Sequence, residues 1–147
     1  YRDSWGMLCG RRYWPWGILP NKTGNSRQRV LGALIVGLSI LNVWLIQPKK
    51  ATQWRGGYAK TIIEEFKVYG LSKEFCYLVG FLKVGLALVL LASIKFATLT
   101  LIGSLGLAVL LLGSVIMHIK VSDKLLKSFP ALLFLTMNLA IAFISST

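Results

Sequence analysis

Acidic residues, histidine and cysteine are scarce in this chain of 147 residues. Five aspartates and glutamates stand against 17 lysines and arginines, so the net charge is +12 with the single histidine neutral. The two cysteines, Cys9 and Cys76, provide no disulfide framework and no metal-binding motif. The chain also lacks a Gly-rich phosphate loop, a Cys-x-x-Cys pair and a Ser-His-Asp set within a membrane. We therefore expect no catalytic residues and no metal site.

Apolar residues, in contrast, are abundant: they make up 55% of the chain, and the mean hydropathy is +0.65. A soluble domain this short has one core and cannot bury several separate apolar runs, whereas a bilayer accepts each run as a spanning helix. The sequence predicts an all-α integral membrane bundle of four transmembrane helices within residues 30–147. The predicted spans are 30–46, 75–94, 96–117 and 129–144.

Short polar signals separate these spans. Only Lys95 divides the second from the third, which predicts a tight antiparallel hairpin with Lys95 reaching water. Ser128 is the expected N-cap of the fourth span, with Pro130 in its first turn. Several small residues predict close helix packing. They are Ala33, Gly37, Gly103, Gly106 and Gly113.

Residues 1–29 form a basic and aromatic N-terminal arm that we expect to be extended. Two interpretations stand: an anchor at the membrane surface, or a strap that binds a neighbouring subunit. The candidate partner-binding residues are Trp5, Tyr13, Trp14, Trp16, Arg11 and Arg12. A first residue of Tyr rather than Met fits either a processed organellar protein or a truncated chain.

Residues 61–69 predict a short helix lying on the membrane surface. Its apolar residues are Ile62, Ile63 and Phe66, and its polar face is assigned to Glu64, Glu65 and Lys67. Gly70 is expected to end this helix, and Ser72 to begin the next span.

The basic residues gather beside the apolar runs, where they meet lipid head groups; we therefore expect membrane lipids as partners and no nucleic acid. Because both sides of the predicted bundle carry many cations, the positive-inside rule does not choose an orientation.

Lys83 and His118 are the candidate cofactor-binding residues. A lysine near mid-bilayer costs about 2.5–3.5 kcal/mol, so Lys83 either binds a buried anion or quinone, or bonds to backbone carbonyls, Asn42 or Asn138. His118, near the end of the third span, either contacts chlorophyll or quinone, pairs with Asp123, or lies at the interface as an amphipathic ring.

The order of motifs over residues 30–144 resembles the DoxX-like membrane family. The resemblance is carried by Phe66, Gly70-Leu71-Ser72, Gly80-Phe81-Leu82-Lys83, a Gly-rich third span ending at His118, and Asp123 before a last span that starts near a proline. It implies a four-helix bundle that acts as the membrane subunit of a thiosulfate:quinone oxidoreductase, a redox-linked accessory protein or an assembly factor. Many members of that family have an acidic residue where Lys83 stands.

Three functional hypotheses follow. The leading one is a non-catalytic accessory subunit of a larger membrane complex. If Tyr1 is a processed end, we expect a thylakoid or mitochondrial inner membrane, with a photosystem as one candidate complex. The alternatives are the membrane subunit of a quinone-linked oxidoreductase and a chaperone for membrane protein assembly.

Overall fold

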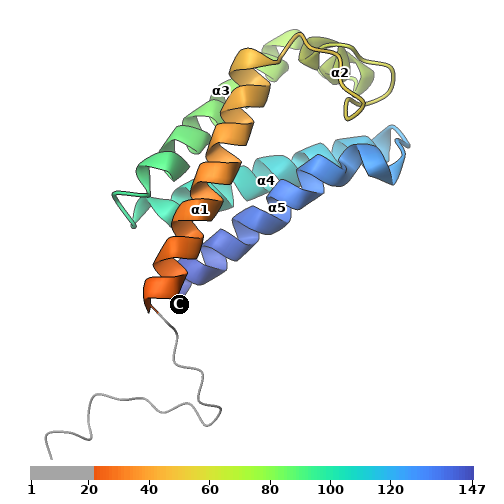
Figure 1. Ribbon diagram of the computed structural model, residues 1–147. Coiled ribbons are helices and arrows are strands. Elements are labelled where there is room, and N and C mark those ends of the chain that lie inside the picture. The colour runs from red at the N-terminus through yellow and green to blue at the C-terminus, as the bar shows by residue number, and fades with distance from the viewer. Residues whose placement is uncertain (1–21) are drawn as a thin grey trace, which may run out of the picture.

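The chain is helical through most of the part that the computed structural model describes, residues 22–147 (Figure 1). The elements are α1 (Lys22–Leu41), its continuation as one π-helical turn η1 (Asn42–Ile46), α2 (Ile62–Val68), α3 (Lys73–Ala92), α4 (Leu99–Lys120) and α5 (Leu125–Ser146). α1 with η1, α3, α4 and α5 are each long and apolar enough to cross a bilayer. The prediction of an all-α membrane bundle with four spans and one additional short helix is confirmed.

Each span packs against two others: α4 contacts α5 and α3, and α1 contacts α3 and α5. Figure 1 shows α1 alongside α3, and α4 alongside α5; the pairs meet near the start of α1 and the C-terminus and spread apart towards the end where α2 lies. The exposed residue Lys95 lies in the turn between α3 and α4, as the hairpin prediction required. α2 lies at the wider end of the bundle, where the helices spread apart.

The first and last spans begin earlier than the sequence predicts. α1 starts at Lys22, inside the segment expected to be an extended arm, and the Arg29 guanidinium on its second turn donates to the Ser93 carbonyl (3.4 Å) and the Thr100 hydroxyl (3.1 Å). These bonds tie α1 to the α3–α4 turn, a tertiary contact that local composition does not reveal.

α5 starts at Leu125, so the assignment of Ser128 as its N-cap is wrong: Ser128 is buried inside the helix, and Pro130 lies beyond the first turn. The turn before α5 is short because Ser122 adopts a left-handed conformation (φ 56°) and the Asp123 amide bonds back to the His118 carbonyl (3.0 Å). The chain therefore re-enters a helix sooner than the apolar pattern suggests.

α2 has well-defined ends. The Thr61 hydroxyl accepts the Glu64 amide and caps the start. At the other end Gly70 has φ +78°, and the Leu71 amide bonds to the Phe66 carbonyl (2.9 Å), as in a Schellman motif. The Ser72 hydroxyl then caps α3 by accepting the Phe75 amide (3.2 Å). The predicted stop at Gly70 and start at Ser72 are confirmed.

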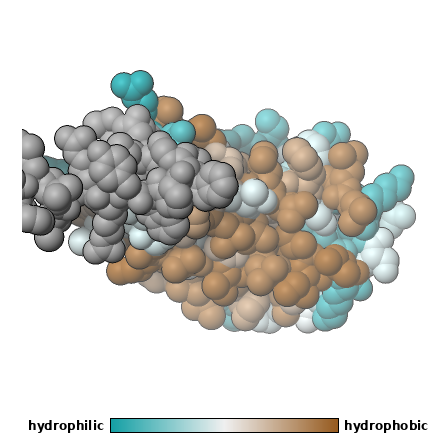
Figure 2. Space-filling view, turned by 90° about the horizontal axis from the view of Figure 1, so that it is seen from below, coloured by the Kyte–Doolittle hydropathy of each residue, from teal (hydrophilic) through white to brown (hydrophobic). Residues whose placement is uncertain are grey.

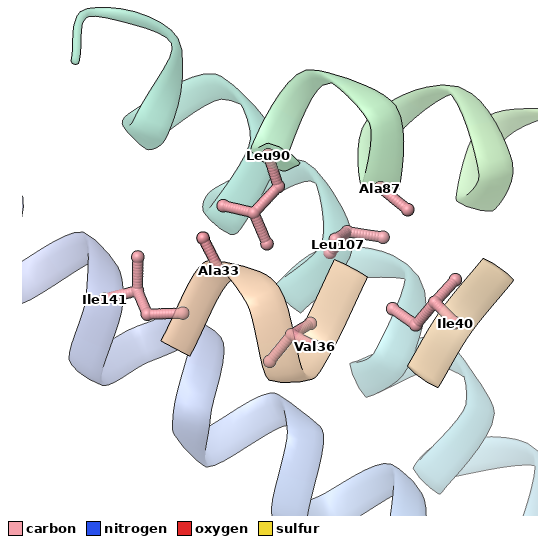
Figure 3. Close-up of a cluster of buried hydrophobic side chains, with 7 residues drawn as sticks. All are labelled: Ala33, Val36, Ile40, Ala87, Leu90, Leu107 and Ile141. Carbon is pink, nitrogen blue, oxygen red and sulfur yellow. The ribbon is translucent and has the colours of Figure 1, made fainter. Parts of the chain in front are cut away.

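The main apolar cluster fills the centre of the bundle, where side chains from all four spans point towards one another (Figure 3). Its buried members are Ala33, Val36, Ile40, Ala87, Leu90, Leu107 and Ile141. Outside it, large apolar residues cover much of the helical surface visible in Figure 2, and many of them are exposed. A surface of this kind matches a hydrocarbon environment.

Small residues allow the helices to approach closely. Ala33 is fully buried, and a Cβ added at Gly37 or Gly106 would meet a leucine of α3 within 3 Å. At Gly103 the added Cβ would lie 2.9 Å from the backbone nitrogen of Leu90. Gly113 differs, because nothing lies within 4 Å of its Cβ position. Gly113 therefore borders open space.

Candidate functional site

Lys83 points into the bundle from the middle of α3 and is only 7% exposed. Its ammonium donates to the Ser114 hydroxyl on α4 (3.0 Å) and lies 5.3 Å from the centre of the Trp44 ring on η1. A cation over an indole face is attracted by the ring quadrupole. The partners of Lys83 are thus a hydroxyl and an aromatic ring, rather than Asn42 or Asn138.

His118 lies one helical turn beyond Ser114 on the same face of α4 and is also buried. Its Nδ1 is 2.9 Å from Oδ2 of Asp123, in the turn before α5. The Tyr69 hydroxyl lies 3.4 Å from Nδ1 and 3.3 Å from Nε2. Both ring nitrogens therefore have protein neighbours, so ligation of a chlorophyll magnesium would require one of these contacts to be given up.

Glu65 and Tyr69 bring α2 to this histidine. The Tyr69 hydroxyl donates to Oε1 of Glu65 (2.8 Å), which also accepts the Gly56 amide (2.8 Å) and lies 3.9 Å from Nε2 of His118. Burial, followed by the nearby Glu65 carboxylate, raises the pKa of the Tyr69 phenol above its ordinary value. Tyr69 therefore stays protonated and remains a hydrogen-bond donor.

Arg55 fixes the loop that leads into α2. Its guanidinium is 6% exposed and donates to Oε2 of Glu65 (3.3 Å) and to the carbonyls of Gln47 (3.0 Å), Pro48 (3.3 Å) and Lys50 (3.0 Å). These carbonyls follow the end of η1, and that of Pro48 also accepts the Ile62 amide at the start of α2 (3.0 Å). Arg55 thus links the end of the first span to α2.

Asp123 joins the loop before α2 to the start of α5. Its carboxylate accepts the Gly57 amide (3.0 Å) and lies 3.7 Å from the Lys127 ammonium, which also donates to the Gly57 carbonyl. Burial alone would raise the pKa of Asp123, but the hydrogen bonds from His118 and Gly57 and the charge of Lys127 outweigh it, so the pKa lies below its ordinary value. Asp123 is therefore ionised at neutral pH.

A cavity of about 400 Å³ extends from this polar network into the bundle. Glu65, Tyr69 and His118 border it near α2, Lys83 and Ser114 lie one turn deeper, and the remaining wall is mainly apolar and aromatic. The apolar wall includes Trp44, Phe66, Phe75, Val79, Leu111 and Phe134, and Gly113 supplies the open space noted above. A volume of this size, with few polar groups among apolar ones, is typical of a small-molecule site.

The cavity also reaches the surface that lipid would cover. Among its lining residues, Val43 on η1, Phe75 on α3 and Val109 on α4 are exposed by 40%, 42% and 69%. Apolar side chains at the rim suit a ligand that enters from the bilayer.

The structure thus brings together the two predicted cofactor-binding residues, Lys83 and His118, on one cavity. The predicted partner-binding residues of the arm lie outside the described residues; they are Trp5, Tyr13, Trp14, Trp16, Arg11 and Arg12. Among residues 22–147, no group of three or more His, Cys, Asp or Glu side chains is placed to hold a metal ion.

Sequence reasoning missed Arg55, Glu65 and Tyr69. It assigned Glu65 to the polar face of α2, which is wrong, because Glu65 is turned towards Tyr69 and His118 while Glu64 is exposed. A signal was available: Ile62, Glu65, Phe66 and Tyr69 follow the i, i+3, i+4, i+7 spacing of one helix face. An acidic residue within such a face indicates a buried partner.

Comparison with known proteins gave one family. A search of curated proteins found no match, and neither did a search of solved structures. The model of the DoxX-like family matches residues 55–142, which include Arg55, Glu65, Tyr69, Lys83, His118 and Asp123. The first span and the arm lie outside the match, so the likeness is shorter than the motifs over 30–144 suggested. A match over more than half of the chain, joined to four spanning helices, shows that this protein is a membrane protein of the DoxX-like family.

Proposed function

We propose that this chain is the quinone-binding, non-catalytic membrane subunit of a larger oxidoreductase complex. The observation that carries the proposal is the cavity, in which Lys83, Tyr69 and His118 face a largely apolar space among the spanning helices. A quinone has a flat ring with two carbonyl oxygens and an apolar tail. The Lys83 ammonium suits a carbonyl oxygen, and the apolar walls suit the ring and the tail.

Each part of the cavity has a role in this proposal. The Lys83 ammonium donates to one carbonyl oxygen. Tyr69 and His118, which are bonded to Glu65 and Asp123, border the ring at the network end. Trp44, Phe66 and Phe134 supply apolar contact for the ring and tail. A bound quinone takes up two electrons and two protons to become the quinol, and the quinol releases them; a partner subunit supplies or accepts the electrons.

Two other roles stay predictions: an accessory subunit of an organellar or photosynthetic complex, and an assembly chaperone. The family match names no organelle and no partner. The cavity favours the quinone proposal over them because neither alternative requires a space of this size lined by a buried cation.

Filling the cavity tests the proposal. Gly113→Leu places a side chain in open space on the cavity wall, and Gly85→Leu places the same side chain in open space away from it. Both changes replace a helical glycine, so their effects on helix propensity match. The measurements are the quinone retained after purification in mild detergent, by extraction and mass spectrometry, and the binding of added decylubiquinone.

We expect wild type and Gly85→Leu to bind decylubiquinone, and Gly113→Leu to bind it at least about 10-fold more weakly because the added side chain occupies ligand volume. Equal binding by all three proteins would place any quinone elsewhere. No binding by the folded wild-type protein would end the quinone proposal.

A further inference from the structure

Lys83 is a buried cation without a carboxylate partner in the part of the chain that the structure describes. Glu65 is held by Arg55, Tyr69 and the Gly56 amide. Asp123 is engaged by His118, Lys127 and the Gly57 amide in the same way. Both carboxylates nearest the cavity are therefore already occupied by other donors.

The two contacts of Lys83 do not supply a negative charge. The Ser114 hydroxyl is neutral and also donates to the Leu110 carbonyl (3.2 Å), and the Trp44 ring offers only its quadrupole. A buried ammonium that is not paired is costly in a low-dielectric environment, and a counter-charge removes most of that cost. Lys83 also lines the cavity, so a ligand held there is in a position to supply the counter-charge.

We propose that the head group held in the cavity is anionic: a hydroxylated quinone or a related ionised phenol, whose negative oxygen pairs with the Lys83 ammonium. The inference rests on the proposed quinone site and narrows its ligand. The aromatic walls formed by Trp44, Phe66 and Phe134 favour an ionised ring over a fatty acid, which carries its charge on a carboxylate without a ring.

Three probes test this, first on the wild-type protein and then on variants. The first is a 3-alkyl-2-hydroxy-1,4-naphthoquinone, which is ionised at neutral pH; the second is its 2-methoxy ether, which has the same ring and tail but no charge. Dodecanoate is the third probe. Binding of each to the full chain in nanodiscs of neutral lipid is measured at pH 7 by calorimetry.

We expect the hydroxy compound to bind about 10- to 100-fold more tightly than its ether, the range given by one hydrogen bond to a charged group. Lys83→Met should reduce that preference to about twofold or less, and Lys83→Arg should keep most of it. Lys95→Met, which removes the same charge at the exposed α3–α4 turn, should leave the preference unchanged.

Each other outcome has a definite meaning. Equal binding of the hydroxy compound and its ether by wild type would overturn the anionic ligand and leave the quinone site standing. Binding of dodecanoate as tight as that of the hydroxy compound would overturn the ring-bearing head group. If neither naphthoquinone binds, the quinone site fails together with the inference.

Discussion

His118 on α4 and Asp123, five residues further along, lie 2.9 Å apart between Nδ1 and Oδ2, and both side chains are 6% exposed. This contact closes the α4–α5 turn. It also connects the turn to the rest of the site, because Asp123 accepts the Gly57 amide and His118 lies beside Tyr69. One buried pair thus joins the α4–α5 hairpin to α2 and the loop before it.

Asp123→Asn should lower the free energy of unfolding by about 1–3 kcal/mol at pH 7, because the variant keeps the size of the side chain but loses the charge that holds His118 and Lys127. The pKa of Asp123 is lower in the folded state than its ordinary value of about 3.9, so ionised Asp123 stabilises the wild-type fold at any pH above that value. This stability is lost as the pH falls through the folded-state pKa. The difference between the two proteins should therefore shrink below about pH 4.

Thermal unfolding in mild detergent between pH 3 and pH 8 measures this. A difference that stayed constant across that range would assign the effect of Asp123→Asn to something other than its charge.

Tyr69→Phe should destabilise the protein by about 1–2 kcal/mol without changing the fold, because Glu65 loses one hydrogen bond in a buried setting. Tyr58→Phe is the matched control, since Tyr58 is fully exposed and the same atom is removed; its effect should stay within about 0.5 kcal/mol. Chemical unfolding followed by circular dichroism gives both values. Equal values for the two variants would contradict the assignment of a structural bond to the Tyr69 hydroxyl.

Arg55→Met should loosen the loop between η1 and α2, because the guanidinium donates to three carbonyls of that loop and to Glu65. Arg55→Lys should rescue it poorly, since an ammonium lacks the planar fork of donors. Hydrogen exchange of residues 47–60 is the measurement, and Lys49→Met, at an exposed position, is the control. Unchanged exchange in Arg55→Met would show that other contacts hold the loop.

Gly103→Ala should lower the free energy of unfolding by about 1–3 kcal/mol, because the new Cβ lies 2.9 Å from backbone atoms of Leu90 and α3 and α4 must move apart. Gly85→Ala, with nothing within 4 Å of its Cβ position, should leave stability unchanged or raise it by up to about 1 kcal/mol. Thermal unfolding compares the two variants. Tolerance of Ala at position 103 would argue against tight packing of α3 on α4.

Local signals predicted some helix ends correctly and others wrongly. The stop at Gly70 and the start at Ser72 follow from the backbone freedom of glycine and the capping hydroxyl of serine, both of which act within a few residues. Ser128 satisfied the same capping rule and yet lies inside α5, because the short turn at Ser122 and Asp123 brings the chain back into a helix earlier. Arg29 likewise lies inside a helix, and it bonds to Ser93 and Thr100 on either side of the α3–α4 turn, contacts that the local sequence does not reveal.

The sequence singled out Lys83 and His118 but missed Arg55, Glu65 and Tyr69. Lys83 and His118 stand out because ionisable residues are rare in apolar runs and expensive there. Arg55, Glu65 and Tyr69 lie in a polar segment where charged residues are ordinary, so their burial depends on which face α2 presents to the bundle.

By itself, the sequence determined that this protein is an all-α membrane bundle with four spans, because long apolar runs have no other stable environment. It also supplied a buried lysine and one histidine. Only the tertiary structure decided that these two residues border the same cavity and that Glu65, Tyr69, Asp123 and Arg55 surround its polar end. The reason is that the contacts between α2 and the bundle, such as that of Tyr69 with His118, join residues far apart in the chain. The packing of the helices, rather than any local pattern, brings these residues together.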